Sequence, residues 1–428
     1  MKTPILPVKG TRDFYPEDMA IRTWLHRTVR KVSESFGYQE YEGPFLESID
    51  LYAAKSGEEL VKEQSYVFPD RDGNLITLRP ELTPTLARMV AKRQRQLVYP
   101  LRWWSFGPFW RYERPQKGRS REFFQWNVDL IGINSPEADA EIVAIVASFF
   151  HEVGLNPRQV NIHINDRRLV DAELTALGVP DSNHAMIFRL IDRRDKMQEA
   201  EWDAYAYENG LDTQTLNGLK SLLADDQLWK KSDQLIRFFN AIDAMDLSSW
   251  VVYDPGIIRG LDYYTGIVFE AQEALGDIHR AVLGGGRYDN LMEAVGGDPL
   301  PAAGFAMGDM VISLILQKQD LLPSNLSLLP ASVLVTVFDD ASQPAALTLA
   351  SELRQAGLKV DCFPEAAKLG KQFKYADRMG IRLAVILGSD EIRNNLVSIK
   401  DLRTGAQHTV PQDEAVHTIQ QMLMAEHR

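Results

Sequence analysis

At residues 103–132 the chain reads WWSFGPFWRYERPQKGRSREFFQWNVDLIG, two aromatic, strand-like runs that flank a basic loop at Pro115–Arg121. From Arg102 to Arg121 the chain carries six basic residues and one acidic residue, a local balance of +5. The pattern predicts a β-hairpin with a cationic loop. Such a loop suits a polyphosphate, because guanidinium groups bind phosphate oxygens with two parallel hydrogen bonds. An ordinary solvated hairpin with an aromatic core is the alternative.

Polar side chains follow one face of each predicted strand. Successive side chains of a strand alternate between its two faces, so Arg111 and Glu113 are expected side by side. The same alternation puts Gln125, Asn127 and Asp129 on one face of the return strand, between apolar neighbours. A polar row on a buried face is costly unless it meets a polar ligand. The hairpin therefore predicts a binding surface.

The composition excludes several classes of protein. The 428 residues predict two or three domains, and the net charge of −12 argues against a general nucleic-acid coat. The one cysteine, Cys362, excludes disulfides within the chain and cysteine-based zinc sites, and it fits a reducing compartment. No apolar run is long enough to span a membrane, and the N-terminus has no signal-peptide pattern. A cytoplasmic protein is expected.

Three regions follow one another along the chain. Residues 1–328 alternate helix and strand signals, interrupted at about 171–250 by a stretch without strand signals that predicts a helical insertion. Within the first region Gly284–Gly286 predicts a tight turn. Residues 331–428 alternate strands and helices, which predicts an α/β domain with a largely parallel sheet.

A basic helix face marks the last region. Lys368, Lys371, Lys374 and Arg378 recur at helical spacing, opposite an apolar face. A helix of this kind can lie along a phosphate backbone. A surface helix charged for solubility is the alternative.

Four clusters of unusual composition fall within the first 310 residues. They are TLRPELT (77–83), the hairpin, RGLDYYTG (259–266), and GGGRYD (284–289) followed by GFAMG (304–308). None has the spacing of a phosphate-binding GxxxxGK[ST] loop, and the eight histidines show no metal-ligand spacing.

Together these clusters resemble the histidyl-tRNA synthetases, a family of class II aminoacyl-tRNA synthetases. The resemblance runs from KGTRDFYPED (9–18) to the C-terminal region, and RGLDYYTG is its most specific part. It implies an α+β catalytic domain built on an antiparallel sheet, with a helical insertion and a C-terminal α/β anticodon-binding domain. It also implies a homodimer that activates L-histidine with ATP and Mg²⁺ and then transfers it to tRNA(His).

The resemblance implies a role for each matching residue. Arg111 and Arg259 are expected at the α-phosphate as the catalytic residues, and both are expected to contact histidine. The other residues expected at histidine are Glu81, Leu82, Thr83, Gln125, Asp129, Tyr263 and Tyr264. Those expected at ATP, besides Arg111, are Glu113 at the adenine amino group, Phe123 on the adenine ring, and Arg119 and Arg121 at the outer phosphates. The basic face Lys368, Lys371, Lys374 and Arg378 is expected to contact tRNA.

One position departs from the family pattern. Class II enzymes usually carry an arginine after the GFxxG turn, and here Val311 stands in its place. A regulatory paralogue that senses histidine without catalysis is therefore an alternative. Such paralogues usually lack the arginine of RGLDYY and the C-terminal domain. This chain has Arg259 and a full region after residue 331, which favours the ligase.

Overall fold

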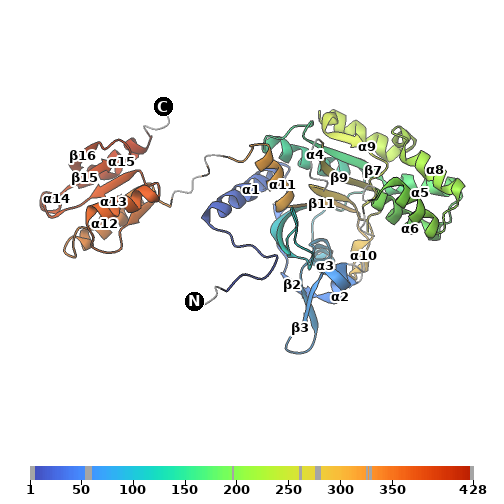
Figure 1. The fold of residues 1–428 in the computed structure, drawn as a ribbon, viewed down its shortest axis with the longest axis horizontal. Helices are drawn as coiled ribbons and strands as arrows, with labels where there is room; N and C mark the ends of the chain where they lie inside the picture. Colours follow the sequence, from blue (N-terminus) through green and yellow to red (C-terminus); the bar gives the residue numbers. More distant parts are fainter. Residues whose placement is uncertain are drawn as a thin grey trace. The chain divides into compact units, whose positions relative to one another are not determined.

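The computed structural model describes residues 5–53, 60–194, 197–259, 263–274, 281–323, 326 and 330–424. It divides into two compact units, residues 1–324 and 325–428, which are shown in Figure 1. The predicted domain limits at 328 and 331 stay predictions, since residues 327–329 lie outside the described ranges. No helix among the described residues is long and apolar enough to cross a membrane.

The first unit combines helices with strands. Its strands are β1 (Gln39–Glu40), β2 (Leu46–Ser48), β3 (Tyr66–Pro69), β4 (Leu75–Leu78), β5 (Leu101–Trp110), β6 (Glu122–Ile131), β7 (Val160–Asp166), β8 (Val251–Tyr253), β9 (Ile267–Glu273), β10 (Leu283–Arg287) and β11 (Ala302–Gly308). Its helices outside residues 167–250 are α1 (Pro16–Ser35), α2 (Ile49–Ala53), η1 (Leu60–Gln64), α3 (Thr83–Arg93), α4 (Pro136–Glu152), α10 (Leu291–Ala294) and α11 (Asp309–Lys318).

An eight-stranded sheet of order β1-β5-β6-β11-β10-β9-β7-β8 carries the first unit. Every pairing from β5 to β7 is antiparallel, and one parallel pairing closes each edge, β1 with β5 and β7 with β8. The expected antiparallel catalytic sheet is confirmed. A separate three-stranded sheet has the order β2-β4-β3, in which β3 and β4 form a hairpin.

The sheet separates a large core from a smaller one. Figure 1 shows α1, α4 and α11 on one side of the sheet and α3 with α10 on the other. On β6, Trp126, Val128 and Leu130 point into the large core and are buried. The alternate positions Gln125 and Asn127 therefore face the other side, which is where α3 lies. Strand alternation alone thus places a polar row on that side.

Residues between β7 and β8 form helices and no strands in the described ranges. These are α5 (Arg167–Ala176), α6 (Asp181–Arg193), α7 (Glu199–Glu208), α8 (Thr213–Leu223), η3 (Leu228–Lys231), α9 (Asp233–Ala244) and η4 (Ser248–Trp250). The apolar side chains of these helices continue the large core, as Leu190, Trp202 and Phe238 do. The limits predicted for the insertion, 171 and 250, stay a prediction.

The second unit has its own core and a five-stranded sheet of order β13-β12-β14-β15-β16. Its strands are β12 (Val333–Val335), β13 (Val360–Cys362), β14 (Leu383–Ile386), β15 (Leu396–Asp401) and β16 (Gln407–Pro411). Its helices are α12 (Gln343–Gln355), α13 (Leu369–Arg378), α14 (Ser389–Arg393), η5 (Gln412–Glu414) and α15 (Ala415–Met424).

The expected largely parallel sheet is only half right. β12 pairs in parallel with β13 and β14, but β14–β15 and β15–β16 are antiparallel. A parallel return needs a connection of a dozen or more residues, and β15 is joined to β16 by a turn of five residues, 402–406. The last two strands therefore form a hairpin.

Two local predictions were wrong. Gly284–Gly286 is the interior of β10, paired with β9 and β11, and not a turn. Glycine is required there by close packing, since a Cβ on Gly285 would lie 2.4 Å from the carbonyl oxygen of Gly304. Arg111 and Glu113 lie just beyond the end of β5 in irregular backbone, and not within an extended strand.

Candidate active site

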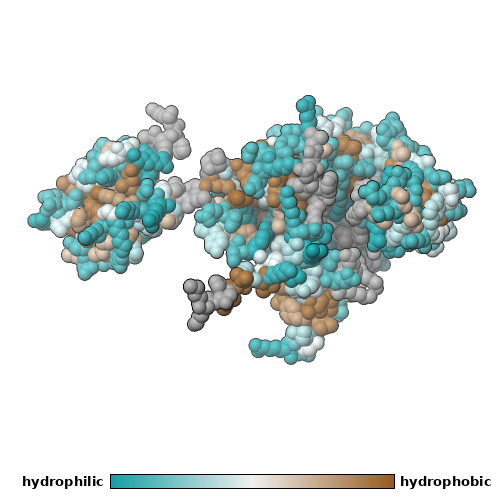
Figure 2. Space-filling view, viewed as in Figure 1, coloured by the Kyte–Doolittle hydropathy of each residue, from teal (hydrophilic) through white to brown (hydrophobic). Residues whose placement is uncertain are grey.

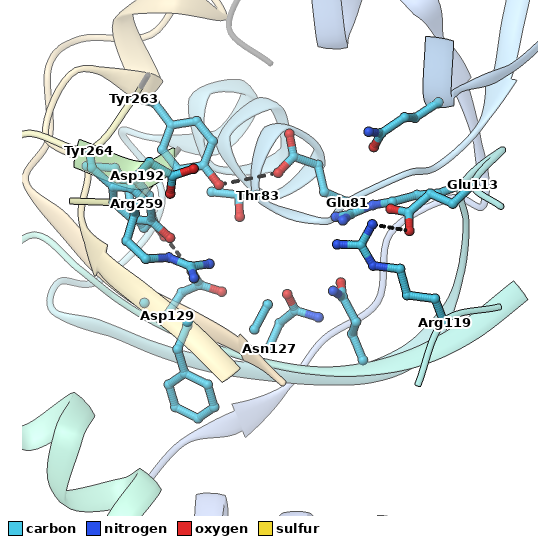
Figure 3. A pocket seen from close by; sticks show the side chains of 18 residues that line it. Glu81, Thr83, Glu113, Arg119, Asn127, Asp129, Asp192, Arg259, Tyr263 and Tyr264 are labelled. Carbon is cyan, nitrogen blue, oxygen red and sulfur yellow. Dashed lines mark hydrogen bonds and ion pairs between the residues drawn. The ribbon is translucent and has the colours of Figure 1, made fainter. Parts of the chain in front are cut away.

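A cavity of about 420 Å³ opens on the face of the sheet opposite α4. Figure 3 shows the side chains that surround it. The lining side chains are predominantly polar and come from seven separated stretches of sequence. They are Gln64, Glu81, Thr83, Arg111, Glu113, Arg119, Gln125, Asn127, Asp129, Asp192, Arg259, Tyr263, Tyr264, Gly284, Tyr288, Gly304, Phe305 and Ala306.

Small residues on the neighbouring strand leave room for the cavity. The polar row of β6 pairs with β11 residue by residue: Gln125 opposite Gly308, Asn127 opposite Ala306, and Asp129 opposite Gly304. A side chain on Gly304 would place its Cβ 2.3 Å from Oδ1 of Asp129. The hollow therefore follows from the glycines and alanine of β11, next to the strand that carries the polar side chains.

Buried polar atoms point to a polar ligand. Among the described residues, Gln125 Oε1, Asn127 Nδ2 and Arg259 Nε are buried without a hydrogen-bonding partner. A buried polar group left unpaired costs free energy of about 1–3 kcal/mol. All three residues line the same cavity, so a ligand with donors and acceptors would recover that cost.

Arg259 is fixed by its backbone and by an ion pair. Its φ is +62°, in the left-handed region that few residues other than glycine adopt, and its guanidinium pairs with the Glu270 carboxylate. Burial disfavours the charged guanidinium, but the carboxylate outweighs it and the pKa of Arg259 is raised. Gly284 on β10 makes the space, because a Cβ there would lie 2.2 Å from Cζ of Arg259.

Asp129 is a buried carboxylate that accepts a hydrogen bond from the hydroxyl of Tyr288. Burial raises the pKa of Asp129 to about 7, and the tyrosine offsets only part of that shift. At neutral pH the carboxyl group is therefore balanced between its two protonation states. A cation entering the cavity would favour the ionised form.

The tyrosine pair and Glu81 meet at one end of the cavity. The Tyr263 hydroxyl donates to Oε2 of Glu81 at 3.3 Å, and the rings of Tyr263 and Tyr264 lie 4.9 Å apart. Thr83 opens α3 beside them. Figure 3 shows this group across the cavity from Glu113 and Arg119.

The opposite end is cationic and leads to a second, smaller cavity. Arg119 Nη1 lies 2.9 Å from Oε2 of Glu113, and Arg111 Nε donates to the carbonyl of Pro80 at 2.9 Å. All three residues also line the smaller cavity of about 120 Å³, together with Phe123 and Val311. A flat ring system would find apolar side chains there beside two guanidinium groups.

The structure places ten of the predicted histidine and ATP residues around the large cavity and Phe123 at the small one. Two lie elsewhere. Leu82 is the buried residue that precedes α3 in the sequence. The guanidinium of Arg121 lies 3.9 Å from the centre of the Tyr112 ring. The individual roles of all these residues stay predictions.

The site also contains residues that the sequence patterns did not single out. Tyr288 and Gly304 belong to recognised clusters, GGGRYD and GFAMG, but nothing in the sequence tied them to Asp129. Asp192 belongs to α6 in the helical region and carries no local signal at all. Only the fold brings it to the cavity.

The four basic residues predicted to contact tRNA lie on one face of α13 and at the residue that precedes it. Lys368, Lys371, Lys374 and Arg378 are exposed, while Gln372 and Ala376 on the other face are buried. Lys371 is held by Glu365 at 2.8 Å.

Comparison with known proteins gives a consistent answer. The family model described as histidyl-tRNA synthetase matches residues 10–310, and the anticodon binding domain model matches residues 332–422. A histidine–tRNA ligase of Pyrococcus abyssi is 38% identical over 437 residues, which cover 97% of this chain and 99% of that protein. The chloroplastic/mitochondrial histidine–tRNA ligase of Arabidopsis thaliana is 37% identical over 421 residues, 96% of this chain and 85% of that one.

A solved structure agrees with this result. The histidyl-tRNA synthetase from Nostoc sp. PCC 7120 superimposes with a TM-score of 0.78 at 27% sequence identity. The alignment covers 98% of this chain and 100% of the Nostoc chain.

Proposed function

This chain belongs to the histidyl-tRNA synthetase family, and from that premise we propose that its cavity is the active site of a histidine–tRNA ligase. The enzyme activates L-histidine with ATP to histidyl-adenylate and pyrophosphate, and then transfers histidine to the 3′ end of tRNA(His). The observation that carries the proposal is the meeting of Arg111 and Arg259 at one cavity with a polar row and a tyrosine pair.

The residues of the cavity suit adenylate formation. The histidine carboxylate attacks the α-phosphorus of ATP, and negative charge builds up on the phosphoryl oxygens. Arg111 and Arg259 would stabilise that charge from opposite sides without reorganisation. No protein nucleophile is needed, so alignment and fixed cations account for the step.

Each substrate fits a different end of the cavity. Glu81, Thr83, Gln125 and Asp129 would hold the histidine ammonium, while Tyr263 and Tyr264 would enclose the imidazole. Phe123 would stack on adenine and Glu113 would accept from its amino group. Val311 lines the same small cavity as Glu113 and Phe123, which supports an apolar contact with adenine in place of the usual arginine.

Magnesium is expected to bind together with ATP. Within the described ranges, no group of three or more metal-ligating side chains lies together. Mg²⁺ commonly binds through substrate phosphates and only one or two carboxylates. The ion would therefore enter with ATP, held chiefly by the phosphate oxygens. The ion, when bound, neutralises phosphate charge.

A homodimer is supported by an exposed apolar surface. Figure 2 shows apolar residues gathered over the small β2-β4-β3 sheet. The large exposed side chains there are Phe45, Leu46, Val67, Phe68 and Leu75. Contiguous apolar surfaces of this kind mark interaction sites. We propose that a second copy of the chain covers this surface. The enzyme is also proposed to work in the cytoplasm.

The experiment that tests the function is ATP–pyrophosphate exchange with each of the twenty amino acids. Exchange with histidine alone is expected. Activity with none of them would favour the regulatory paralogue, and activity with another amino acid would refute the substrate assignment. Charging of tRNA(His) by the same preparation then tests the second step.

A further inference from the structure

The segment that precedes α1, dark blue in Figure 1, is bound through its backbone to the hairpin loop at residues 115–121. The carbonyl oxygen of Gly10 accepts hydrogen bonds from the backbone N–H of Arg121 at 2.8 Å and from the hydroxyl of Ser120 at 2.6 Å. Gly10 has a φ of +86°, and a Cβ there would lie 2.7 Å from Cγ of Arg121. Glycine therefore permits this close approach of the two segments.

The carboxylate of Asp309 joins the same segment to two further elements. Its Oδ2 accepts a hydrogen bond from Nη2 of Arg12 at 2.8 Å, and its Oδ1 accepts one from the backbone N–H of Phe124 at 2.9 Å. Asp309 is the first residue of α11, and Phe124 follows Phe123 on β6. One buried side chain thus connects the N-terminal segment, β6 and α11.

The elements joined in this way also surround the small cavity. Ser120, Phe123 and Asp309 line it, as do Arg119 and Val311. Phe123 is proposed to stack on adenine, and Arg119 is expected at the outer phosphates of ATP. A displacement of Asp309 would therefore move the groups that are proposed to hold the nucleotide.

The stability of α11 does not by itself explain this arrangement. A carboxylate in the first turn of a helix stabilises that helix through its dipole. Asp309 has a second use, because both of its oxygens accept hydrogen bonds from groups outside α11. One of those groups belongs to Arg12, which lies 297 positions away in the sequence.

Aromatic packing holds Arg12 beside this carboxylate. The guanidinium of Arg12 lies 4.8 Å from the centre of the Phe14 ring, and Phe14 meets Phe124 edge-on with ring centroids 5.9 Å apart. Arg22 of α1 lies over both rings, at 4.7 and 4.4 Å. The side chains of Arg12 and Asp309 are 28% and 7% exposed, so their ion pair is largely removed from water, where such a bond is stronger.

We propose that Arg12 is a positioning residue for ATP, acting through Asp309 on the strand and the loop that surround the nucleotide. This assignment rests on the proposed function, which places ATP at this end of the site. Arg12 itself does not line either cavity, so it acts through its partner. The pair fixes the first turn of α11, in which Val311 stands where the family usually has an arginine.

The test measures ATP binding to the full-length protein by calorimetry in the absence of histidine, so that it does not depend on ligase activity. Arg12→Gln keeps much of the length of the side chain and should raise the Kd for ATP about tenfold, as for a lost hydrogen bond between charged groups. Asp309→Asn keeps the shape of the side chain and should weaken ATP binding to a similar extent. The double variant should bind ATP about as well as the weaker of the two single variants, because both changes break one interaction.

The sign of the Asp309→Asn effect distinguishes positioning from simple attraction of charges. If Arg12 acted on ATP only through its positive charge, removal of the negative charge of Asp309 would tighten the binding of the polyanionic nucleotide. Tighter or unchanged ATP binding by Asp309→Asn would therefore overturn the proposal. Unchanged ATP binding by Arg12→Gln would overturn it as well.

Exchange kinetics supply the second readout. In both variants KM for ATP should rise about tenfold, while KM for L-histidine should change by less than about twofold. A merely structural role would instead lower kcat through a smaller active fraction and leave both KM values unchanged, which would also overturn the proposal.

A matched control removes another arginine ion pair of the same unit. Arg237→Ala breaks the exposed pair with Glu137 and should change neither ATP binding nor either KM value. Inactivity of the unmodified enzyme with histidine would refute the proposed function, whereas the ATP binding of the variants would still decide the role of Arg12.

Discussion

At the scale of single residues, the site depends on one strand whose alternate side chains face different environments. Trp126 and Val128 of β6 are buried in the large core, whereas Asn127 and Asp129 line the cavity. A shift of one residue would exchange the two faces. The polar row was predictable from the sequence because this alternation is local. The pairing of Asp129 with Tyr288 was not, since 159 positions separate them.

If Asp129 holds the histidine ammonium group, as proposed, histidine binding is linked to proton release. Its pKa of about 7 leaves it about half protonated at pH 7 in the free cavity. A bound ammonium group favours the carboxylate and lowers the pKa, so binding at pH 7 should release roughly half a proton from this group. Calorimetry in two buffers of different ionisation enthalpy measures the release.

Asp129→Asn is the control for this linkage, because it removes the titrating group and keeps the shape. The difference in proton release between the two proteins isolates Asp129 from the titration of histidine itself. Release by the variant equal to that of the unmodified enzyme would refute the role of Asp129.

At the scale of elements, the glycines of β10 and β11 set the depth of the cavity. The triplet at 284–286 was predicted to be a turn because glycine marks turns and close packing alike. Only the pairing partners on β9 and β11 distinguish the two cases. The antiparallel β15–β16 hairpin was missed for a related reason, since strand direction depends on connections and not on composition.

Gly284→Ala should impair catalysis without unfolding the protein. The added Cβ would overlap the end of the Arg259 side chain, which can move away, so the fold is retained while the guanidinium is displaced. Histidine-dependent pyrophosphate exchange should fall on the order of 100-fold, as for a lost oxyanion contact. The thermal unfolding midpoint should change little.

Gly296→Ala serves as a comparison, because open space surrounds Gly296 and its φ of +84° lets the substitution act through backbone strain alone. It should lower the unfolding midpoint but leave the exchange rate of the folded enzyme intact. Full exchange activity in Gly284→Ala would show that the placement of Arg259 does not matter.

The exposed basic face of α13 leads to a prediction about tRNA. If Lys374 contacts a phosphate, Lys374→Ala should raise KM for tRNA(His) several-fold and reduce the slope of log affinity against log salt by about 1. Pyrophosphate exchange should not change, since the adenylate site lies in the other unit. Lys359→Ala, an exposed lysine of the same unit outside α13, is the control. An equal effect of both variants would leave α13 with no special part in tRNA binding.

At the scale of the whole molecule, each unit has a hydrophobic core of its own. A chain that ends at Leu329 should therefore fold and catalyse histidine-dependent pyrophosphate exchange at close to the full rate. It should charge tRNA(His) poorly, because the anticodon-binding unit is missing. Undiminished charging by this fragment would refute the tRNA role of the second unit.

The whole-molecule level also explains which site residues sequence reasoning found. Arg111, Glu81 and Arg259 lie in compact motifs that carry a family resemblance, so their meeting at one cavity was expected. Asp192 comes from a helix whose composition resembles any charged surface helix. Its place in the site follows from how α6 packs into the large core, which depends on contacts far apart in sequence.

The central claim is that guanidinium groups from two distant segments act on one phosphoryl group. A double-mutant cycle of Arg111→Ala and Arg259→Ala in histidine-dependent pyrophosphate exchange tests it most directly. Each single change should slow exchange on the order of 100-fold, and the double change by far less than the product of the two. Strictly multiplicative losses, or an unchanged rate in either single variant, would contradict the claim.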